Sequence, residues 1–170
     1  RDVVHLFNSL TGFSKLGTLR KISAAPGNLK KQVIEIIRRE KENALSGNKA
    51  HITAKMNSLV DSDVVDELYA ASCSGVKIEL IIRGLCILRP QVKGLSENIT
   101  VRSIVGRFLE HSRILIAHNK GENEVYLTSA DWMPRNFLRR IEIMFPVENK
   151  ILKEKIVHNI IPLYMDDNTN

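Results

Sequence analysis

The chain has 170 residues, of which 44% are apolar, so it is large enough to bury the core of about one domain. Its 25 Lys and Arg outweigh 19 Asp and Glu, and the net charge of +6 predicts a polyanionic partner: phosphate chains, nucleotide, nucleic acid or an acidic membrane. No apolar run approaches the roughly 18 residues of a membrane span, and no signal segment opens the chain. We therefore expect a soluble cytoplasmic protein.

Helical periodicity dominates the first part of the chain. Apolar side chains repeat at helical spacing over residues 2–10. Asn28 is expected to cap a second helix, which residues 46–48 end. The charged run Arg38–Glu42 inside that helix is typical of a solvated face. Because the pattern begins directly at Arg1, we interpret the chain as a piece of something longer.

The period changes at residue 51. Residues 52–56 predict a strand, and Asp61 or Asp63 then caps a helix that ends at Gly75. Residues 76–83 are rich in β-branched and leucine side chains, which is typical of a strand buried on both faces of a parallel sheet. Strand, helix and strand over about 30 residues form a βαβ unit.

Later runs complete an α/β fold with a mixed, mostly β-sheet core of about six strands flanked by helices. The further strands are expected at residues 99–105, 111–118, 124–129 and 140–146. A final helix over residues 150–163 is expected to bury one side, consisting of Ile151, Leu152, Ile156, Ile160 and Ile161.

His111 and Arg113 form the first candidate site. They lie two residues apart at the head of a predicted strand, so the pleat would send both side chains to one face. This pairing suits phosphoryl chemistry, because imidazole can act as nucleophile or acid/base near neutral pH while guanidinium neutralises phosphate oxygens. The alternative is a strand-edge histidine beside an unrelated surface arginine, and His-x-Arg alone favours that alternative.

The segment Thr128-Ser129-Ala130-Asp131 ends another predicted strand with hydroxyl groups and an acid. Such a strand end lets backbone N–H groups and hydroxyls approach an anion. An ordinary turn, with Asp131 capping the next helix, explains the same residues equally well.

Several arginines could complete a phosphate site. Arg83 ends the buried strand, and ligands of open α/β sheets gather at the carboxyl ends of strands. Arg89, Arg135, Arg139 and Arg140 are further candidates, because a guanidinium meets phosphate with two parallel hydrogen bonds and stays ionised. Taken singly, each is more easily explained as a solvated charge or the partner of a glutamate.

Other chemistries find little support. No acid-base-nucleophile order surrounds Ser112 or Ser129, and there is no glycine-rich dinucleotide or P-loop motif. Cys73 and Cys86 have no CxxC or metal spacing, so we expect reduced thiols. We expect no bound metal and a structural role for the remaining histidines, which are His5, His51, His118 and His158.

Long collinear blocks of the sequence resemble the C-terminal catalytic region of bacterial polyphosphate kinase, whose halves are similar to the phospholipase D fold. They cover most of residues 51–148. The blocks are Thr53–Asp61, Leu68–Ser72, Ile81–Gly84, Gly94–Asn98, Ser103–Arg113, Val125–Met133 and Arg135-Asn136.

The resemblance implies an enzyme that transfers the terminal phosphate of ATP reversibly to inorganic polyphosphate, with Mg²⁺ and through a phosphohistidine outside this fragment. His111 matches a second histidine on the nucleotide phosphates, Arg83 an ATP-binding arginine and Arg140 an arginine that contacts phosphate. We expect Arg113 and Arg135 to bind phosphate as well.

The resemblance also implies an organisation. Residues 1–50 would be a helical lead-in and first strand joining a preceding catalytic half, residues 51–165 the catalytic domain, and residues 166–170 a disordered tail. The implied partners are ATP, ADP and polyphosphate, with no specific nucleic acid. We expect the intact enzyme to be a homo-oligomer and leave open a peripheral membrane association.

The phospholipase D motif itself is only partly kept. It reads His-x-Lys, four residues, Asp, whereas Arg113 and His118 stand here, and residues 128–131 only approximate its Gly-Ser-x-Asn. A diesterase or nuclease half completed by dimerisation is therefore one rival. A basic nucleic-acid-binding module is another, disfavoured because only nine aromatic residues occur. With one half-site present, we expect the fragment to bind phosphate weakly and to be inactive alone.

Overall fold

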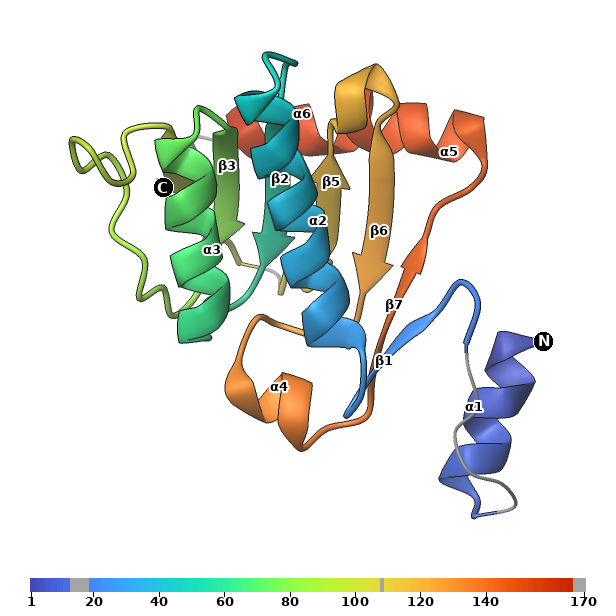
Figure 1. The fold of residues 1–170 in the computed structure, drawn as a ribbon. Coiled ribbons are helices and arrows are strands. Elements are labelled where there is room, and N and C mark those ends of the chain that lie inside the picture. The colour runs from blue at the N-terminus through green and yellow to red at the C-terminus, as the bar shows by residue number, and fades with distance from the viewer. Residues whose placement is uncertain (13–18, 108, 167–170) are drawn as a thin grey trace.

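The computed structural model describes residues 1–12, 19–107 and 109–166 (Figure 1). Seven described strands form one sheet: β1 (Ser23–Ala25), β2 (His51–Met56), β3 (Lys77–Ile82), β4 (Ile99–Arg102), β5 (Ile114–Ala117), β6 (Glu124–Thr128) and β7 (Glu142–Pro146). The helices are α1 (Asp2–Leu10), α2 (Leu29–Leu45), α3 (Ser62–Cys73), η1 (Asn119–Gly121), α4 (Pro134–Leu138), α5 (Lys150–Lys155), η2 (Ile156–Ile160) and α6 (Ile161–Asp166).

The strand order β1-β7-β6-β5-β2-β3-β4 brings distant segments together at one edge of the sheet. Strands β2, β3 and β4 are parallel, whereas the other neighbours pair antiparallel. Consequently β2, β3 and β6 end where β5 and β7 begin. We call this side the carboxyl edge; it is marked by Met56, Ile82, Arg113, Thr128 and Glu142.

Helices cover both faces of the sheet. In Figure 1, α2 and α3 lie in front of the strands, whereas α5, η2 and α6 cross behind them, and α4 lies below the carboxyl edge. Leu29, Val33 and Leu68 of the front helices share a buried cluster with the strands. Behind the sheet, Ile156 and Ile161 form a second, smaller cluster with β5 and β6. The mixed α/β fold predicted from the sequence is confirmed.

Several details differ from the expectation. The sheet has seven described strands and not about six, because the three-residue β1, which no local pattern located, pairs antiparallel with β7. Strand β4 ends at Arg102, and strand β5 begins only at Ile114. The final helix is interrupted by the π-helical turn η2, and Ile151 and Leu152 are 78% and 52% exposed. The expected apolar side is therefore buried only in part, where it packs on β5 and β6.

Two described elements of the first fifty residues, β1 and α2, share the core with the rest of the sheet. β1 extends the sheet, and α2 contributes Val33, Ile36 and Ile37 to the main cluster. The expected boundary at residue 50 thus falls within one continuous core. Of the expected tail, residue 166 closes α6, and residues 167–170 lie outside the described residues. Among the described helices, none has the length and apolar character needed to cross a membrane.

The charged run of α2 is not wholly a solvated face, because Glu40 is fully buried. Its carboxylate accepts hydrogen bonds from the backbone N–H of His51 at 3.1 Å and of Asn119 at 2.9 Å, and from the Asn43 amide at 3.2 Å. These bonds tie α2 to the start of β2 and the end of β5. A buried carboxylate is satisfied here by N–H donors alone.

Replacing Glu40 by alanine is expected to destabilise the fold by about 3 kcal/mol, because two backbone donors lose their acceptor in a buried place. The matched control is Glu42→Ala, two residues further on the same helix, where the side chain is exposed and a change within about 0.5 kcal/mol is expected. Urea unfolding of both variants measures the difference, and equal unfolding free energies would contradict the prediction.

Candidate active site

An ion pair between Arg113 and Asp131 occupies the centre of the carboxyl edge. Arg113 Nε lies 2.9 Å from Asp131 Oδ1 and Nη2 lies 3.1 Å from Oδ2, and both side chains are only 10% exposed. Oδ1 also accepts the backbone N–H of Asn57 at 2.8 Å and of Ser58 at 3.4 Å. Burial raises the pKa of Asp131, but the guanidinium and the backbone donors outweigh it and hold that pKa below its ordinary value.

His111 lies directly on the Arg113 guanidinium. Its Nε2 is 3.0 Å from Nη2 and its Nδ1 is 3.3 Å from Nη1, and the imidazole is exposed to solvent. Both residues precede β5, so their expected position within a strand is wrong, and the pleat is not what brings them together. Asp131 fixes the arginine, and the histidine packs against the arginine.

Arg83 follows β3 at the same edge, and its backbone is held close to the end of β2. Gly84 N–H donates to the Asn57 carbonyl at 2.7 Å, and a Cβ on Gly84 would lie only 3.0 Å from that oxygen. The Arg83 side chain lines an open cavity of about 440 Å³, together with Val105, Arg107 and Leu109. This cavity has room for a phosphate-bearing ligand beside a permanent positive charge.

Arg140 and Arg135 lie toward the opposite end of the edge. Arg140 Nε is 3.3 Å from Glu142 Oε1, yet its side chain is 60% exposed, and Arg135 is exposed on α4. The ends of β3 and β7 are four strands apart, about 19 Å at the usual spacing. The structure thus brings His111 and Arg113 into contact, whereas Arg83 and Arg140 flank them from strands on either side.

Neither explanation of the segment 128–131 is correct in full. The N-cap of α4 is Met133, so Asp131 does not cap that helix. The hydroxyl groups are engaged internally: Thr128 Oγ1 donates to the Ile143 carbonyl at 2.9 Å, and Ser129 Oγ donates to Glu142. The segment therefore braces β6 against β7 and supplies the carboxylate that anchors Arg113.

Lys55 lies in β2 and was not among the predicted site residues, and its side chain is only 5% exposed. Its ammonium donates to the Ser112 carbonyl at 3.1 Å and the Ser112 hydroxyl at 3.0 Å, and lies 3.6 Å from Glu110. Burial lowers the pKa of Lys55. A lysine between Ala54 and Met56 of a predicted strand was the available signal, because a charge buried in a sheet needs a partner.

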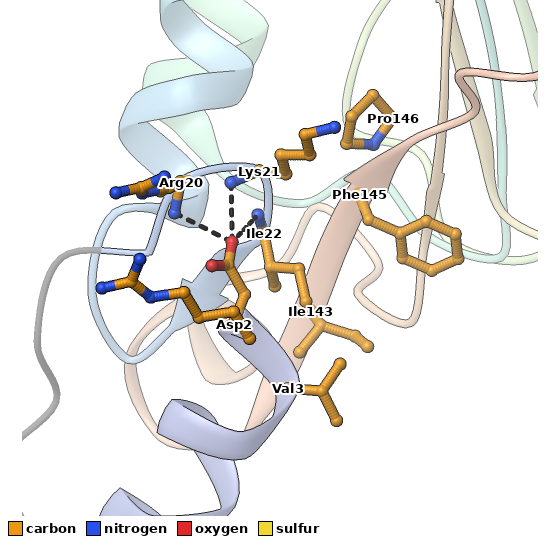
Figure 2. Close-up of a pocket in the computed structure, with 9 residues that line it drawn as sticks. Asp2, Val3, Arg20, Lys21, Ile22, Ile143, Phe145 and Pro146 are labelled. Carbon is orange, nitrogen blue, oxygen red and sulfur yellow. Dashed lines mark hydrogen bonds between the residues drawn. The ribbon is translucent and has the colours of Figure 1, made fainter.

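A larger cavity, of about 570 Å³, is lined by residues of α1, of the turn before β1 and of β7. Figure 2 shows the Asp2 carboxylate bound by the backbone N–H groups of Arg20, Lys21 and Ile22 beside Val3 and Phe145. These amides, that of Lys21 most, lower the pKa of Asp2. None of the predicted site residues lines this cavity.

The described residues contain no group of three or more His, Cys, Asp or Glu side chains placed to hold a metal ion. The carboxylates nearest the site are already engaged, Asp131 by Arg113 and Glu142 by Asn136 at 2.8 Å. The described residues therefore offer no cage of three or more protein ligands for the implied Mg²⁺.

The sheet order and the helices on both faces of the sheet give the chain a fold of the phospholipase D class. A solved structure of that class, the phospholipase D family member Nuc from Salmonella typhimurium, superposes with a TM-score of 0.56 at 15% identity, over 86% of this chain and 91% of the other. At that identity the likeness concerns the fold alone.

The family model described as polyphosphate kinase C-terminal domain 2 matches residues 22–170, and the chain belongs to this family. The polyphosphate kinase of Neisseria meningitidis serogroup B is 52% identical over 99% of this chain and 25% of its own length. The crystal structure of polyphosphate kinase from Porphyromonas gingivalis superposes with a TM-score of 0.94 at 40% identity, covering 99% of this chain and 26% of the other. The chain thus spans about a quarter of the length of these relatives.

Proposed function

We propose that this chain acts within a longer enzyme that transfers the terminal phosphate of ATP reversibly to inorganic polyphosphate, and that its carboxyl edge binds the nucleotide phosphates. The main support is the gathering of Arg83, His111, Arg113 and Arg140 at one edge of the sheet from three separate segments, which follow β3 and precede β5 and β7. A net charge of +6 suits polyanionic substrates. Membership of the polyphosphate kinase family supports the reaction type.

In the proposed reaction, the γ-phosphoryl group moves from ATP to a histidine outside this chain, and ADP leaves. The phosphohistidine then passes the group to the end of a polyphosphate chain, which grows by one unit. His111 and Arg83 stabilise the negative charge that spreads over the transferred group, and Arg140 and Arg135 hold phosphates further along the edge. Arg113 contributes mainly by orienting His111, because the Nε and Nη2 atoms of its guanidinium are already hydrogen-bonded to Asp131.

The remaining features of the complete enzyme stay predictions. These are a homo-oligomeric state, a cytoplasmic location, a peripheral membrane association and a Mg²⁺ requirement. The junction of residues 1–50 with a preceding catalytic half is a prediction of the same kind. So is the inactivity of the isolated chain, which follows because the phosphorylated histidine would be supplied from outside it.

Arg83→Ala in the full-length enzyme is expected to raise the KM for ATP about tenfold or more, because a charge-assisted contact to phosphate is lost. Arg38→Ala is the matched control, since Arg38 pairs with Glu67 between α2 and α3, away from the edge. Steady-state kinetics of polyphosphate synthesis measure both. An Arg83 variant with an unchanged KM for ATP would remove this residue from the nucleotide site.

The diesterase alternative is disfavoured by the Arg113–Asp131 pair, since a guanidinium neutralised by a carboxylate leaves little charge for a diester phosphate. Incubating the chain with a bis(nitrophenyl) phosphate ester tests this point, because a dimeric diesterase would release nitrophenol and a kinase part would not. Competition of polyphosphate with labelled single-stranded DNA tests the nucleic-acid alternative, which predicts poor displacement.

A further inference from the structure

Lys55 is a buried cation in the centre of the sheet that the proposed reaction does not use. It lies on β2, opposite Ile81 of β3 and Ile114 of β5, and its side chain is 5% exposed. An ammonium group removed from water is costly unless it is well paired. Its partners therefore identify which part of the structure depends on this charge.

All the polar partners of Lys55 belong to the segment just before β5, or contact it. The ammonium donates to both the carbonyl and the hydroxyl oxygen of Ser112, and it lies 3.6 Å from Glu110. Ser112 and Glu110 are the two neighbours of His111 in the chain. Lys55 thus contacts Ser112 on one side of the histidine and the Glu110 carboxylate on the other.

The C-terminal helix α6 closes this arrangement from behind. The Lys55 ammonium lies 4.6 Å from the ring centroid of Tyr164, a distance at which a cation–π contact is favourable. The Tyr164 hydroxyl donates to Glu110 and lies 3.4 Å from the Ser112 hydroxyl. One cation, one carboxylate and one phenol therefore lock the Glu110–Ser112 segment against the sheet.

Lys55 does not reach the open cavity of the site. The space that joins it to Arg83 and Glu110 measures about 10 Å³, which holds no more than about one water molecule and no phosphate. A direct contact between this ammonium and a nucleotide is thus excluded in this conformation. Any effect on the reaction has to pass through the segment that carries His111.

We propose that Lys55 is a positioning residue, whose buried ammonium fixes the Glu110–Ser112 segment so that His111 meets Arg113 at the carboxyl edge. The proposal rests on the proposed phosphotransfer function and extends it to the residue that sets the geometry of its histidine. Displacing a catalytic group by about 1 Å is enough to slow a reaction about 100-fold.

Titration separates a positioning role from simple packing. The charged and titratable groups that face Lys55 are Glu110, Tyr164, Arg83 and Arg113. Burial lowers the pKa of Lys55 from its usual 10.5, whereas burial and the Glu110 bond raise the pKa of Tyr164 above its usual 10.0. The Tyr164 hydrogen bond keeps the pKa of Glu110 below 4.5. Glu110 is therefore already ionised when Lys55 loses its proton, and that loss removes the positive charge that holds the segment.

The test uses Lys55→Met and Lys55→Arg in the full-length enzyme, with Lys77→Met as matched control. Lys77 is a largely exposed lysine at the start of β3, at the opposite edge of the sheet. For Lys55→Met we expect kcat to fall by about 10- to 100-fold, while the KM for ATP stays within about twofold, because Arg83 remains in place. Lys55→Arg is expected to keep more activity and to move the alkaline limb of the kcat profile to higher pH.

Two readouts keep the outcomes distinct. A wild-type enzyme that makes no polyphosphate from ATP would overturn the proposed function. With an active wild type, a Lys55→Met enzyme with unchanged kcat and an unshifted Glu110–Arg113 segment in its crystal structure would overturn the positioning role. If Lys55→Met does not fold, Lys55→Arg decides, because an alkaline limb identical to that of the wild type contradicts the proposal.

Discussion

Replacing His111 by alanine in the full-length enzyme is expected to lower the turnover of polyphosphate synthesis by about 10²–10³-fold, or roughly 3–4 kcal/mol of transition-state stabilisation. The imidazole is exposed at the carboxyl edge and is oriented by both terminal nitrogens of Arg113. Under the proposed function its removal takes away a polar group beside the transferred phosphate, whereas Arg113 stays fixed by Asp131.

The His111→Ala substitution is expected to lower turnover without lowering the stability of the fold. Because His111 is exposed, its truncation is expected to change the unfolding free energy by less than about 0.5 kcal/mol. His158→Ala is the matched control, a 64% exposed histidine that pairs with Glu154 on the C-terminal helix. Rates of ³²P incorporation from labelled ATP measure the effect, and synthesis at the wild-type rate would remove His111 from the site.

Local sequence patterns predicted most of the helices and strands, because helix caps and strand composition depend on residues that are close together in the chain. The helix over residues 2–10 has the expected bounds, and Asp61 caps α3 by accepting the Val64 N–H at 3.2 Å. The buried parallel strand β3 was recognisable from its β-branched and leucine side chains alone. These features depend on short-range hydrogen bonds and on the periodicity of burial.

The features that escaped prediction are set by contacts between distant segments. No local pattern located β1, because this short strand forms by pairing with β7, which lies more than a hundred residues later in the chain. Glu40 is buried because the chain brings the N–H groups of His51 and Asn119 to it. Local spacing carries no trace of either contact, since a charged residue on an amphipathic helix is ordinarily solvated.

Two of the departures from the phospholipase D motif, at positions 113 and 131, explain one another. That motif carries a lysine two residues after its histidine and an asparagine in its second half, whereas Arg113 and Asp131 stand here. Exchanging the neutral partner for a carboxylate lets the arginine form a bidentate pair, which would not arise between lysine and asparagine. The arginine at position 113 and the aspartate at position 131 together predict an ion pair. Either exchange considered alone only weakens the match to the motif.

Removing the carboxylate by Asp131→Ala is expected to destabilise the fold by about 3–5 kcal/mol, because it leaves Arg113 largely buried without its counter-charge. The backbone N–H of Asn57 also loses its acceptor. The matched control is Asp63→Ala, an aspartate that pairs with Lys30 at 2.7 Å but is 67% exposed, for which about 0.5 kcal/mol is expected. Urea unfolding of the two variants measures the difference, and equal costs would contradict the prediction.

Acid provides a second test of the same pair. The pKa of Asp131 in the folded protein lies below its ordinary 3.8, so the stabilisation from its charge is complete above that pH and is lost as the pH falls further. Asp131→Asn keeps an oxygen for the Asn57 N–H but carries no charge at any pH. The gap in unfolding free energy between wild type and Asp131→Asn is therefore expected to be widest near neutrality and to close in acid below about 3.8. A gap that stays constant with pH would mean that hydrogen bonding, and not the charge on Asp131, holds Arg113 beneath His111.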